Sequence, residues 1–157
     1  MSAAARRQRA LPSTIDVAID SRVAQRLVSR ARARSIVQQA LRDAGVRRAM
    51  ISVTFVSRQG IARLNREHLG KRGATDVITF SFAPVTPRAP LVADVYIAPD
   101  VARENARAFG VGPREELIRL LIHGALHAAG LDHPEKGDRT RSAMWRRQER
   151  LVRSAQA

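Results

Sequence analysis

Three of the four histidines in this 157-residue chain lie close together in the sequence, as His123, His127 and His133. On a helix, residues four positions apart share one face, so His123 and His127 can point toward one ligand. Gly130 can adopt a left-handed conformation and turn the chain so that His133 joins them. Three imidazoles leave the fourth position of a tetrahedral Zn²⁺ open for water, as in catalytic zinc sites. We therefore expect one Zn²⁺ per chain on these three histidines, and hydrolytic chemistry.

The same histidine spacing occurs in metzincin peptidases, so peptide hydrolysis is an alternative. A zinc peptidase of that kind needs glutamate directly after the first histidine, where it acts as the general base. The residue at this position is Gly124, which cannot accept a proton. The chain has no cysteine, so no thiolate is available as a fourth ligand that would close a structural site. The pattern favours a catalytic metal over a structural one. It also favours a hydrolase of another substrate over a metzincin-like peptidase.

The net charge of the chain is +14 at pH 7, because 28 Lys and Arg residues stand against 14 Asp and Glu. Such an excess attracts polyanions and speeds their encounter with the protein. A genome rich in G and C also favours arginine codons, and only Lys71 and Lys136 are lysines, so part of the excess can have that origin. We predict contact with nucleic acid, and RNA is the substrate that we expect.

Apolar periodicity predicts elements in the order β-α-β-α-β-β-α-α-α. Strands are expected over residues 14–20, 50–57, 76–82 and 91–98, the last two separated by a proline-rich loop. Helices are expected from Ser21, as capping residue, to about residue 44, and over 59–69, 99–109, 113–130 and 138–152. The predicted fold class is α+β, a single domain with a small mixed four-stranded sheet covered by about five helices.

The composition also predicts how the chain is organised and where it works. Residues 1–13 are rich in Ala and Arg and read as a flexible basic N-terminal arm, followed by a single metal-dependent hydrolase domain over 14–154. The arm lacks the apolar segment of a secretory signal, and no apolar run approaches the ~20 residues of a membrane span. We expect a cytoplasmic protein without a membrane partner.

The histidine segment resembles the signature H-G-x-L-H-x-x-G-x-D-H of the YbeY family, the small bacterial metal-dependent endoribonucleases of rRNA maturation. The matching residues are His123, Gly124, Leu126, His127, Gly130, Asp132 and His133. Two upstream segments are also similar to the family: Leu64-Asn65 followed by the run from Thr75 to Phe80, and the run from Asp94 to Ile97. The resemblance covers about residues 50–145.

This resemblance implies a single-strand-type endoribonuclease that acts on the 3′ end of small-subunit rRNA and in ribosome quality control. Its implied partners are rRNA in the ribosome or its precursors, with ribosomal proteins or assembly factors. In this hypothesis the metal lowers the pKa of its water toward ~7, and nearby cations neutralise the charge that develops on the phosphodiester. The alternative is a ribosome-associated binding factor whose metal mainly stabilises the fold.

Two departures from the family pattern concern the strand residue Ala93, where the family usually has Gly, and Leu69. Many members carry a catalytic Arg at the position of Leu69, so the candidates for supplying a cation are Lys71 and Arg72, with Arg66 beside them. Asp132 is a candidate for orienting an imidazole from the second coordination shell, for handling a proton, or for capping the turn.

Several other side chains have both a structural and a functional interpretation. Thr75 and Asp76 are expected either to form the turn at a strand start or to lie beside the site. Structural roles are expected for Asn65 and Asp94, and His68 is expected at the surface. The cationic stretch of the last helix is either a solvated face or a track for RNA, and consists of Arg146, Arg147, Arg150 and Arg153. Met144 and Trp145 are expected in the core.

Overall fold

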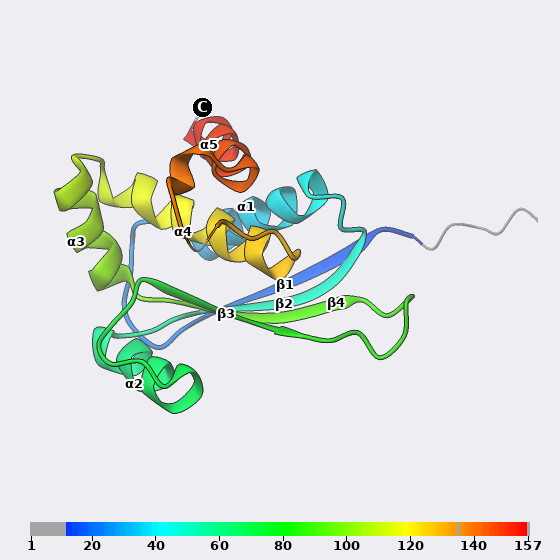
Figure 1. Ribbon diagram of the computed structural model, residues 1–157, viewed down its shortest axis with the longest axis horizontal. Helices are drawn as coiled ribbons and strands as arrows, with labels where there is room; N and C mark the ends of the chain where they lie inside the picture. The colour runs from blue at the N-terminus through cyan, green and yellow to red at the C-terminus, as the bar shows by residue number, and fades with distance from the viewer. Residues whose placement is uncertain (1–11, 135, 157) are drawn as a thin grey trace, which may run out of the picture.

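The computed structural model describes residues 12–134 and 136–156, and its centre is a four-stranded mixed sheet (Figure 1). The strands are β1 (Thr14–Ser21), β2 (Arg48–Phe55), β3 (Val77–Phe82) and β4 (Leu91–Ile97). Their order is β1-β2-β4-β3, in which β1, β2 and β4 run parallel and β3 pairs antiparallel with β4. The parallel pairs need helical crossovers, whereas β3 and β4 are joined as a hairpin.

Alternation along β1 explains why this sheet buries one of its faces. Ile15, Val17 and Ile19 are buried, whereas the residues between them are exposed. Successive side chains of a strand point to opposite faces, so the apolar set is turned toward the helices. The sheet register follows from this pattern, because a slip by one residue would expose the whole apolar set.

Five α-helices and one 3₁₀ turn complete the fold. They are α1 (Arg30–Asp43), α2 (Arg58–Leu69), α3 (Pro99–Phe109), α4 (Pro113–Ala128), the turn Arg139–Arg141, and α5 (Ala143–Gln156). Figure 1 shows α1 and α4 on one side of the sheet with α5 beyond them, and α2 on the other side. The predicted fold class, α+β with a mixed four-stranded sheet and five helices, is confirmed.

The first helix begins eight positions later than the sequence predicts. Ser21 is the last residue of β1, and the capping residue is Ser29, whose side chain accepts a hydrogen bond from the amide of Arg32 at 3.1 Å. The intervening segment is held by Gln25, whose side chain bonds the backbone of Leu27 and Val28. Helix-favouring residues there were misleading because this side chain satisfies the backbone groups that a helical turn would use.

The last helix also begins later than the predicted Asp138. Asp138 caps the 3₁₀ turn by accepting from the amide of Thr140, and the α-helix proper starts at Ala143. Trp145, expected in the core, is only partly buried, whereas Met144 is buried as expected. The short turn therefore shifts which residues of this segment face the interior.

Helix α4 is the central helix of the molecule and is buried on most sides. Leu117, Ile118, Leu121 and Leu126 are each at most 1% exposed. It packs against β3, β4, α1, α3 and α5, so the chain around the two helical histidines is held from several directions. A residue on this helix is positioned more rigidly than one on a loop.

Most of the predicted basic arm, residues 1–11, lies outside the described residues. At its end, the Ser13 hydroxyl donates to the carbonyl of Arg47 at 3.0 Å, next to the start of β1. Among the described helices, none combines the length and the apolar character that crossing a membrane would require.

Candidate metal centre

The three histidines of the sequence motif meet at the C-terminal end of α4. One potential ligand nitrogen from each of His123, His127 and His133 lies within 4.8 Å of the other two. The ring centroids of His123 and His127, one turn apart on α4, are 4.5 Å apart. The His133 ring is 5.1 Å from His127 and 5.7 Å from His123. The three nitrogens lie close enough together to bind one metal ion.

Gly130 brings His133 to the other two rings. Its φ of +91° lies in the left-handed region, where a Cβ atom would be strained. The amide of Gly130 donates to the carbonyl of His127 at 2.9 Å, and the amide of Leu131 donates to that of Leu126 at 3.0 Å. These bonds close the helix end and reverse the chain. The turn predicted at this glycine is therefore present.

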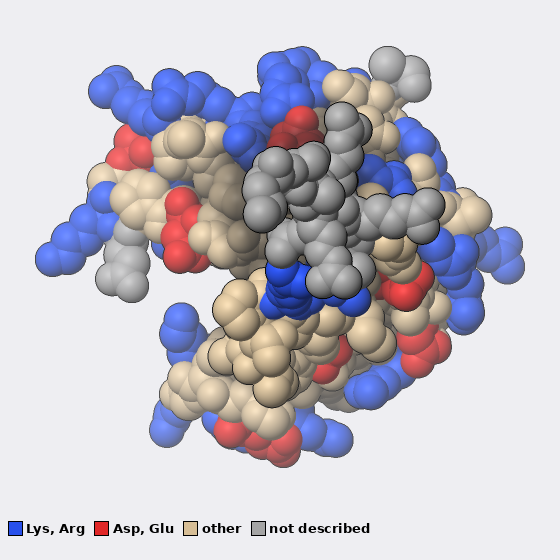
Figure 2. Space-filling model, turned by 90° about the vertical axis from the view of Figure 1, so that its right-hand side faces the viewer, with Lys and Arg blue, Asp and Glu red and all other residues tan. Residues whose placement is uncertain are grey.

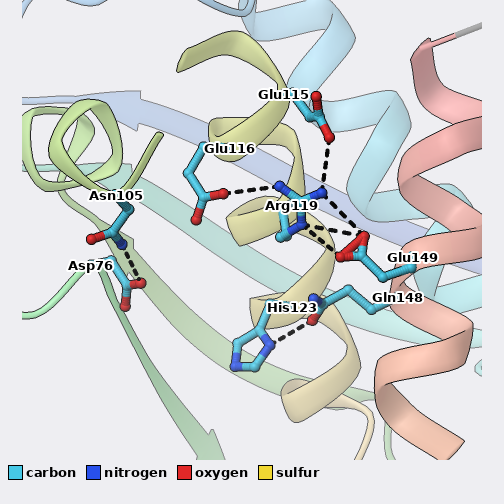
Figure 3. A network of polar contacts seen from close by, with 8 residues as sticks. All are labelled: Asp76, Asn105, Glu115, Glu116, Arg119, His123, Gln148 and Glu149. Atoms are coloured by element: carbon cyan, nitrogen blue, oxygen red, sulfur yellow. Dashed lines mark hydrogen bonds and ion pairs between the residues drawn. The ribbon is translucent and has the colours of Figure 1, made fainter. Parts of the chain in front are cut away.

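Gln148 of α5 holds the ring of His123. The Nδ1–H of His123 donates to the side-chain oxygen of Gln148 at 2.6 Å, and Gln148 is only 2% exposed (Figure 3). This bond selects the tautomer with hydrogen on Nδ1 and leaves the Nε2 lone pair available. A hydrogen-bonded partner on the second ring nitrogen is typical of histidines that bind metals.

Asp132 lies beside the second histidine. Its carboxylate oxygen is 3.3 Å from the Nδ1 atom of His127, while the Asp132 side chain is 85% exposed. This position suits the orienting role among those considered for Asp132, because the carboxylate faces the ring nitrogen that would not bind the metal. The role of Asp132 stays a prediction.

Burial favours the neutral form of two of the imidazoles. Desolvation lowers the pKa of His123, opposed by the hydrogen bond to Gln148. Desolvation likewise lowers the pKa of His127; the neighbouring His133 lowers it further, and Asp132 opposes. Neutral imidazole is the form that binds a metal, so the site is electrostatically prepared for a cation.

A buried ring nitrogen gives an independent test of whether the site fits a metal. The Nδ1 atom of His133 is buried and has no hydrogen-bond partner among the described residues. A buried polar atom without a partner is costly, and a cation bound among the three imidazoles would supply that partner. The donor set and the unpaired nitrogen both fit a metal such as Zn²⁺.

The cations expected to replace the family arginine lie on an exposed loop. Leu69 ends α2 and is 46% exposed, and Lys71 and Arg72 follow it, both exposed. The loop is anchored by Asn65, which is 6% exposed and donates to the carbonyl of Gly73 at 3.0 Å. No ion pair among the described residues holds Lys71 or Arg72 in one place, so their catalytic role stays a prediction.

The remaining candidates divide between structural and site positions. The structure supports a structural role for Asp94, which accepts from the Ser52 hydroxyl at 2.6 Å. His68 is exposed, with its ring 5.4 Å from that of Phe80. Asp76 accepts from the amide of Val77, at the start of β3, and so forms the expected strand-start turn.

Asp76 also belongs to the surroundings of the histidine site. Its second oxygen accepts from Asn105 of α3 at 2.9 Å, and Asp76 lines the same pocket as His123 (Figure 3). Thr75 is adjacent and half-buried. Both roles expected for Asp76 therefore apply. It holds the start of β3, and it lines the pocket beside the histidines.

A cluster of charges lies further along the same face of α4. Arg119 contacts the carboxylates of Glu115, Glu116 and Glu149, each at 2.8–2.9 Å for the nearest pair of atoms (Figure 3). Burial raises the pKa of the Glu116 carboxyl, and Arg119 opposes the shift. The three carboxylates raise the pKa of Arg119 against the effect of its burial. This cluster joins α4 to α5 directly above His123.

Sequence reasoning missed Gln148 and this charge cluster. A signal was present for Gln148, because it lies on the apolar stripe of α5 with Met144, Leu151 and Val152. A polar residue on such a stripe needs a buried partner. Glu116 carries the same signal, since it is buried and shares a face of α4 with His123 and His127.

Gly124 has a packing role that goes beyond the lack of a general base. A Cβ atom built on Gly124 would lie 2.6 Å from the Cγ1 atom of Val95 on β4. There is thus no room for the glutamate side chain of a zinc peptidase at this position. The structure gives a physical reason for disfavouring the peptidase interpretation.

These features define a class of protein: an α+β fold that presents three histidines, in a geometry suited to one metal ion, beside a pocket. The profile of the family described as Endoribonuclease YbeY matches residues 17–156 of the chain. The chain therefore belongs to the YbeY family. This confirms the resemblance stated from the sequence and, with it, the prediction of a hydrolytic endoribonuclease.

Individual relatives agree with this placement over most of their length. A protein from Chlorobium phaeobacteroides named endoribonuclease YbeY is 32% identical over 128 residues, which are 82% of this chain and 89% of the relative. Its namesake from Persephonella marina is 31% identical over 137 residues, 86% of this chain and 89% of the relative. The solution structure of TM1509 from Thermotoga maritima superposes with a TM-score of 0.62 at 26% identity, covering 88% of each chain.

Proposed function

We propose that this protein is a Zn²⁺-dependent endoribonuclease that cuts single-stranded RNA in the maturation of the 3′ end of small-subunit rRNA and in ribosome quality control. The observation that carries the proposal is the convergence of three histidines, with ligand nitrogens within 4.8 Å of one another, in a chain of the YbeY family. The net charge of +14 supports a polyanionic substrate.

His123, His127 and His133 are the proposed ligands, and other residues prepare them. Gln148 fixes the tautomer of His123 through the 2.6 Å bond, and Asp132 lies 3.3 Å from His127 to orient its ring. When bound, Zn²⁺ supplies Lewis acidity that lowers the pKa of water and polarises a phosphoryl oxygen. Zinc is preferred because imidazole ligands in a three-histidine set are typical of catalytic zinc sites.

The charge that develops on the phosphodiester needs cations near the histidines. Lys71 and Arg72 are the proposed source, since they follow α2 on an exposed loop whose position Asn65 anchors. Single replacement of Lys71 or Arg72 by Ala should lower kcat for RNA cleavage while leaving metal binding unchanged. Loss of metal binding in either variant would assign these residues to the fold of the site instead.

The proposed setting is the bacterial cytoplasm, with rRNA in the ribosome or its precursors as partner. Ribosomal proteins or assembly factors would then present the RNA to the site. A binding factor with a mainly structural metal is the second candidate, favoured by Leu69 at the position of the family arginine.

The decisive experiment is cleavage of a precursor RNA that carries the 3′ end of small-subunit rRNA. Purified protein is compared with chelator-treated protein, with the same protein after Zn²⁺ is restored, and with the His127→Ala variant. We expect cleavage only by the first and third samples. Persistent cleavage by a metal-free His127→Ala protein would refute the proposal. Absence of cleavage by protein shown to hold one Zn²⁺, alone and with ribosomal subunits added, would favour the binding factor.

A further inference from the structure

A pocket of about 510 Å³ adjoins the histidine site and is lined by residues of α3, α4, the 3₁₀ turn, α5 and the start of β3. Its lining includes His123 at one end and Glu116 at the other, two turns apart on α4. With a rise of 1.5 Å per residue, these positions are separated by about 10 Å along the helix axis. The volume lies in the range of small-molecule sites and admits a heterocyclic ring.

The charge of this pocket is opposite to that of the molecule as a whole. Its lining carries the three carboxylates of Asp76, Glu116 and Glu149 against the two guanidinium groups of Arg119 and Arg139, whereas the chain carries +14. A phosphate group would be repelled from the carboxylates of Asp76, Glu116 and Glu149. Groups that donate hydrogen bonds without carrying negative charge would be attracted.

One acceptor in the pocket is buried and only partly used. Glu116 is 3% exposed, and one of its oxygens accepts from Arg119 at 2.9 Å. The other oxygen accepts no hydrogen bond from a described residue, and Figure 3 shows it turned away from Arg119. Arg119 holds this carboxylate in place, so the free oxygen can receive a donor at little cost in conformational entropy.

The pocket also has aromatic surface and a cation beside it. Trp145 of α5 and Phe109 of α3 both line it, and nucleobases stack on such rings whatever their sequence. Arg139 lines it as well and is exposed, which suits contact with a phosphate at the pocket mouth. The pocket therefore combines a stacking surface, an acceptor in the interior and a cation near solvent.

We propose that this pocket binds one nucleobase of the RNA substrate next to the cleaved bond, and that Glu116 accepts a hydrogen bond from its exocyclic amino group. Guanine, adenine and cytosine carry such a group, and uracil does not. The carboxylate thus selects an amino-bearing base at this position. The assignment as part of an RNA site rests on the proposed function, since His123 connects the pocket to the metal centre.

The single tryptophan of the chain, Trp145, provides a direct readout of base binding. Zn²⁺-loaded protein is titrated with guanosine, adenosine, cytidine and uridine, and Trp145 fluorescence is followed with correction for absorbance by the nucleoside. Nucleosides lack phosphate and so report on the pocket rather than on the metal. The amino-bearing nucleosides should bind about tenfold more tightly than uridine, as expected for one good hydrogen-bonded base contact.

The test variant is Glu116→Gln, which retains an acceptor for Arg119. The preference over uridine should be lost, because the amide oxygen faces Arg119 and the amide nitrogen, which donates hydrogen bonds, replaces the free oxygen. The matched control is Glu104→Gln, which removes a carboxylate that pairs with Arg58 outside the pocket, and should keep the full preference. If circular dichroism shows that Glu116→Gln is not folded, Glu116→Asp replaces it, because the shorter side chain keeps the charge and draws the carboxylate back from the base.

Saturable quenching with the expected preference, reduced only in the pocket variant, would support the proposal. Absence of saturable quenching, equal affinity for uridine, or an unchanged preference in the folded pocket variant would overturn it. The titration requires no RNA cleavage. Failure of the nuclease proposal would therefore appear as lost cleavage with base binding intact, and failure of this inference as lost base preference with cleavage intact.

Discussion

The hydrogen bond between Gln148 and His123 links two helices at the level of single residues. His123 belongs to α4 and Gln148 to α5, 25 positions later in the chain. Without this partner, the His123 ring could adopt either neutral tautomer and could rotate. The bond thus determines which nitrogen of His123 is free to bind a metal.

Replacing Gln148 by Leu should weaken Zn²⁺ binding about 10- to 100-fold, as is typical when the hydrogen-bond partner of a ligand histidine is removed. Leu preserves the size and the burial of the side chain while it removes the acceptor. The affinity is measured by competition with a chromophoric chelator. Gln38→Leu is the control, because Gln38 donates to the carbonyl of Ile15 on another part of the fold. Equal affinity in the two variants would contradict the positioning role.

Acidification should destabilise the metal-free protein through His123 and His127. Burial lowers the pKa of each in the folded state, relative to about 6.5 in the unfolded chain. At a pH between the folded-state pKa and the unfolded-state pKa, the unfolded chain binds more protons than the folded protein. The free energy of unfolding therefore rises with pH across this window. We expect it to be constant above this window and to fall as the pH drops through about 6.5.

Urea unfolding of chelator-treated protein between about pH 7.5 and 5.5 measures this dependence. The His127→Gln variant should lose part of the slope. His68→Gln is the control, since His68 is exposed and lies apart from the cluster, and it should keep the slope. A free energy of unfolding that increases on acidification would contradict the prediction.

At the scale of elements, the site depends on how closely α4 approaches the sheet. Gly124 lies between the two helical histidines and faces Val95 of β4. A side chain at this position would push α4 away from the strand, and the two histidines would move with the helix. The glycine therefore connects the packing of an element to the geometry of the site.

Gly124→Ala should lower the free energy of unfolding by about 1 kcal/mol. Its Cβ would lie 2.6 Å from Val95 Cγ1, and overpacking of this kind costs about 1–3 kcal/mol, whereas the better helix propensity of Ala returns about 1 kcal/mol. Urea denaturation measures the change. In a Val95→Ala background the opposing methyl group is absent, so the same substitution should cost less. An equal cost in both backgrounds would show that this contact is not responsible.

At the scale of the whole molecule, positive charge is spread widely over the surface. Figure 2 shows Lys and Arg side chains around the visible face, with fewer acidic side chains between them. On the last helix, Arg147 and Arg150 are paired with Asp43 at the end of α1, so half of this cationic stretch has a structural role. Arg146 and Arg153 are exposed. Their side chains are compatible with a solvated face and with an RNA track.

Affinity for single-stranded RNA should fall steeply with salt. With about three phosphate contacts, an increase from about 50 to 200 mM salt would lower it about twentyfold. Fluorescence anisotropy with the His127→Ala protein measures binding without cleavage. The double variant Arg146→Ala/Arg153→Ala should show a shallower dependence if these side chains contact RNA, and an unchanged one if they form a solvated face. An affinity that does not depend on salt would contradict the electrostatic argument.

Sequence reasoning was most successful where chemistry depends on neighbours in the chain. Helical spacing placed His123 beside His127, and the glycine at position 130 indicated the turn that returns His133. It failed for the start of α1, because Gln25 bonds to backbone groups that propensities assign to a helical turn. Competition of this kind between side chain and helix depends on local geometry that residue types do not show.

The sequence by itself determined the ligand histidines expected for the metal, the family and the fold class, since these follow from short-range spacing and periodicity. Only the tertiary structure decided which partners the ligands have. Gln148 meets His123, and Glu149 meets Arg119, because α5 packs on α4. Gly124 meets Val95 because α4 packs on β4. Contacts between residues distant in the chain arise from the packing of whole elements, and no local pattern specifies which side chains meet there.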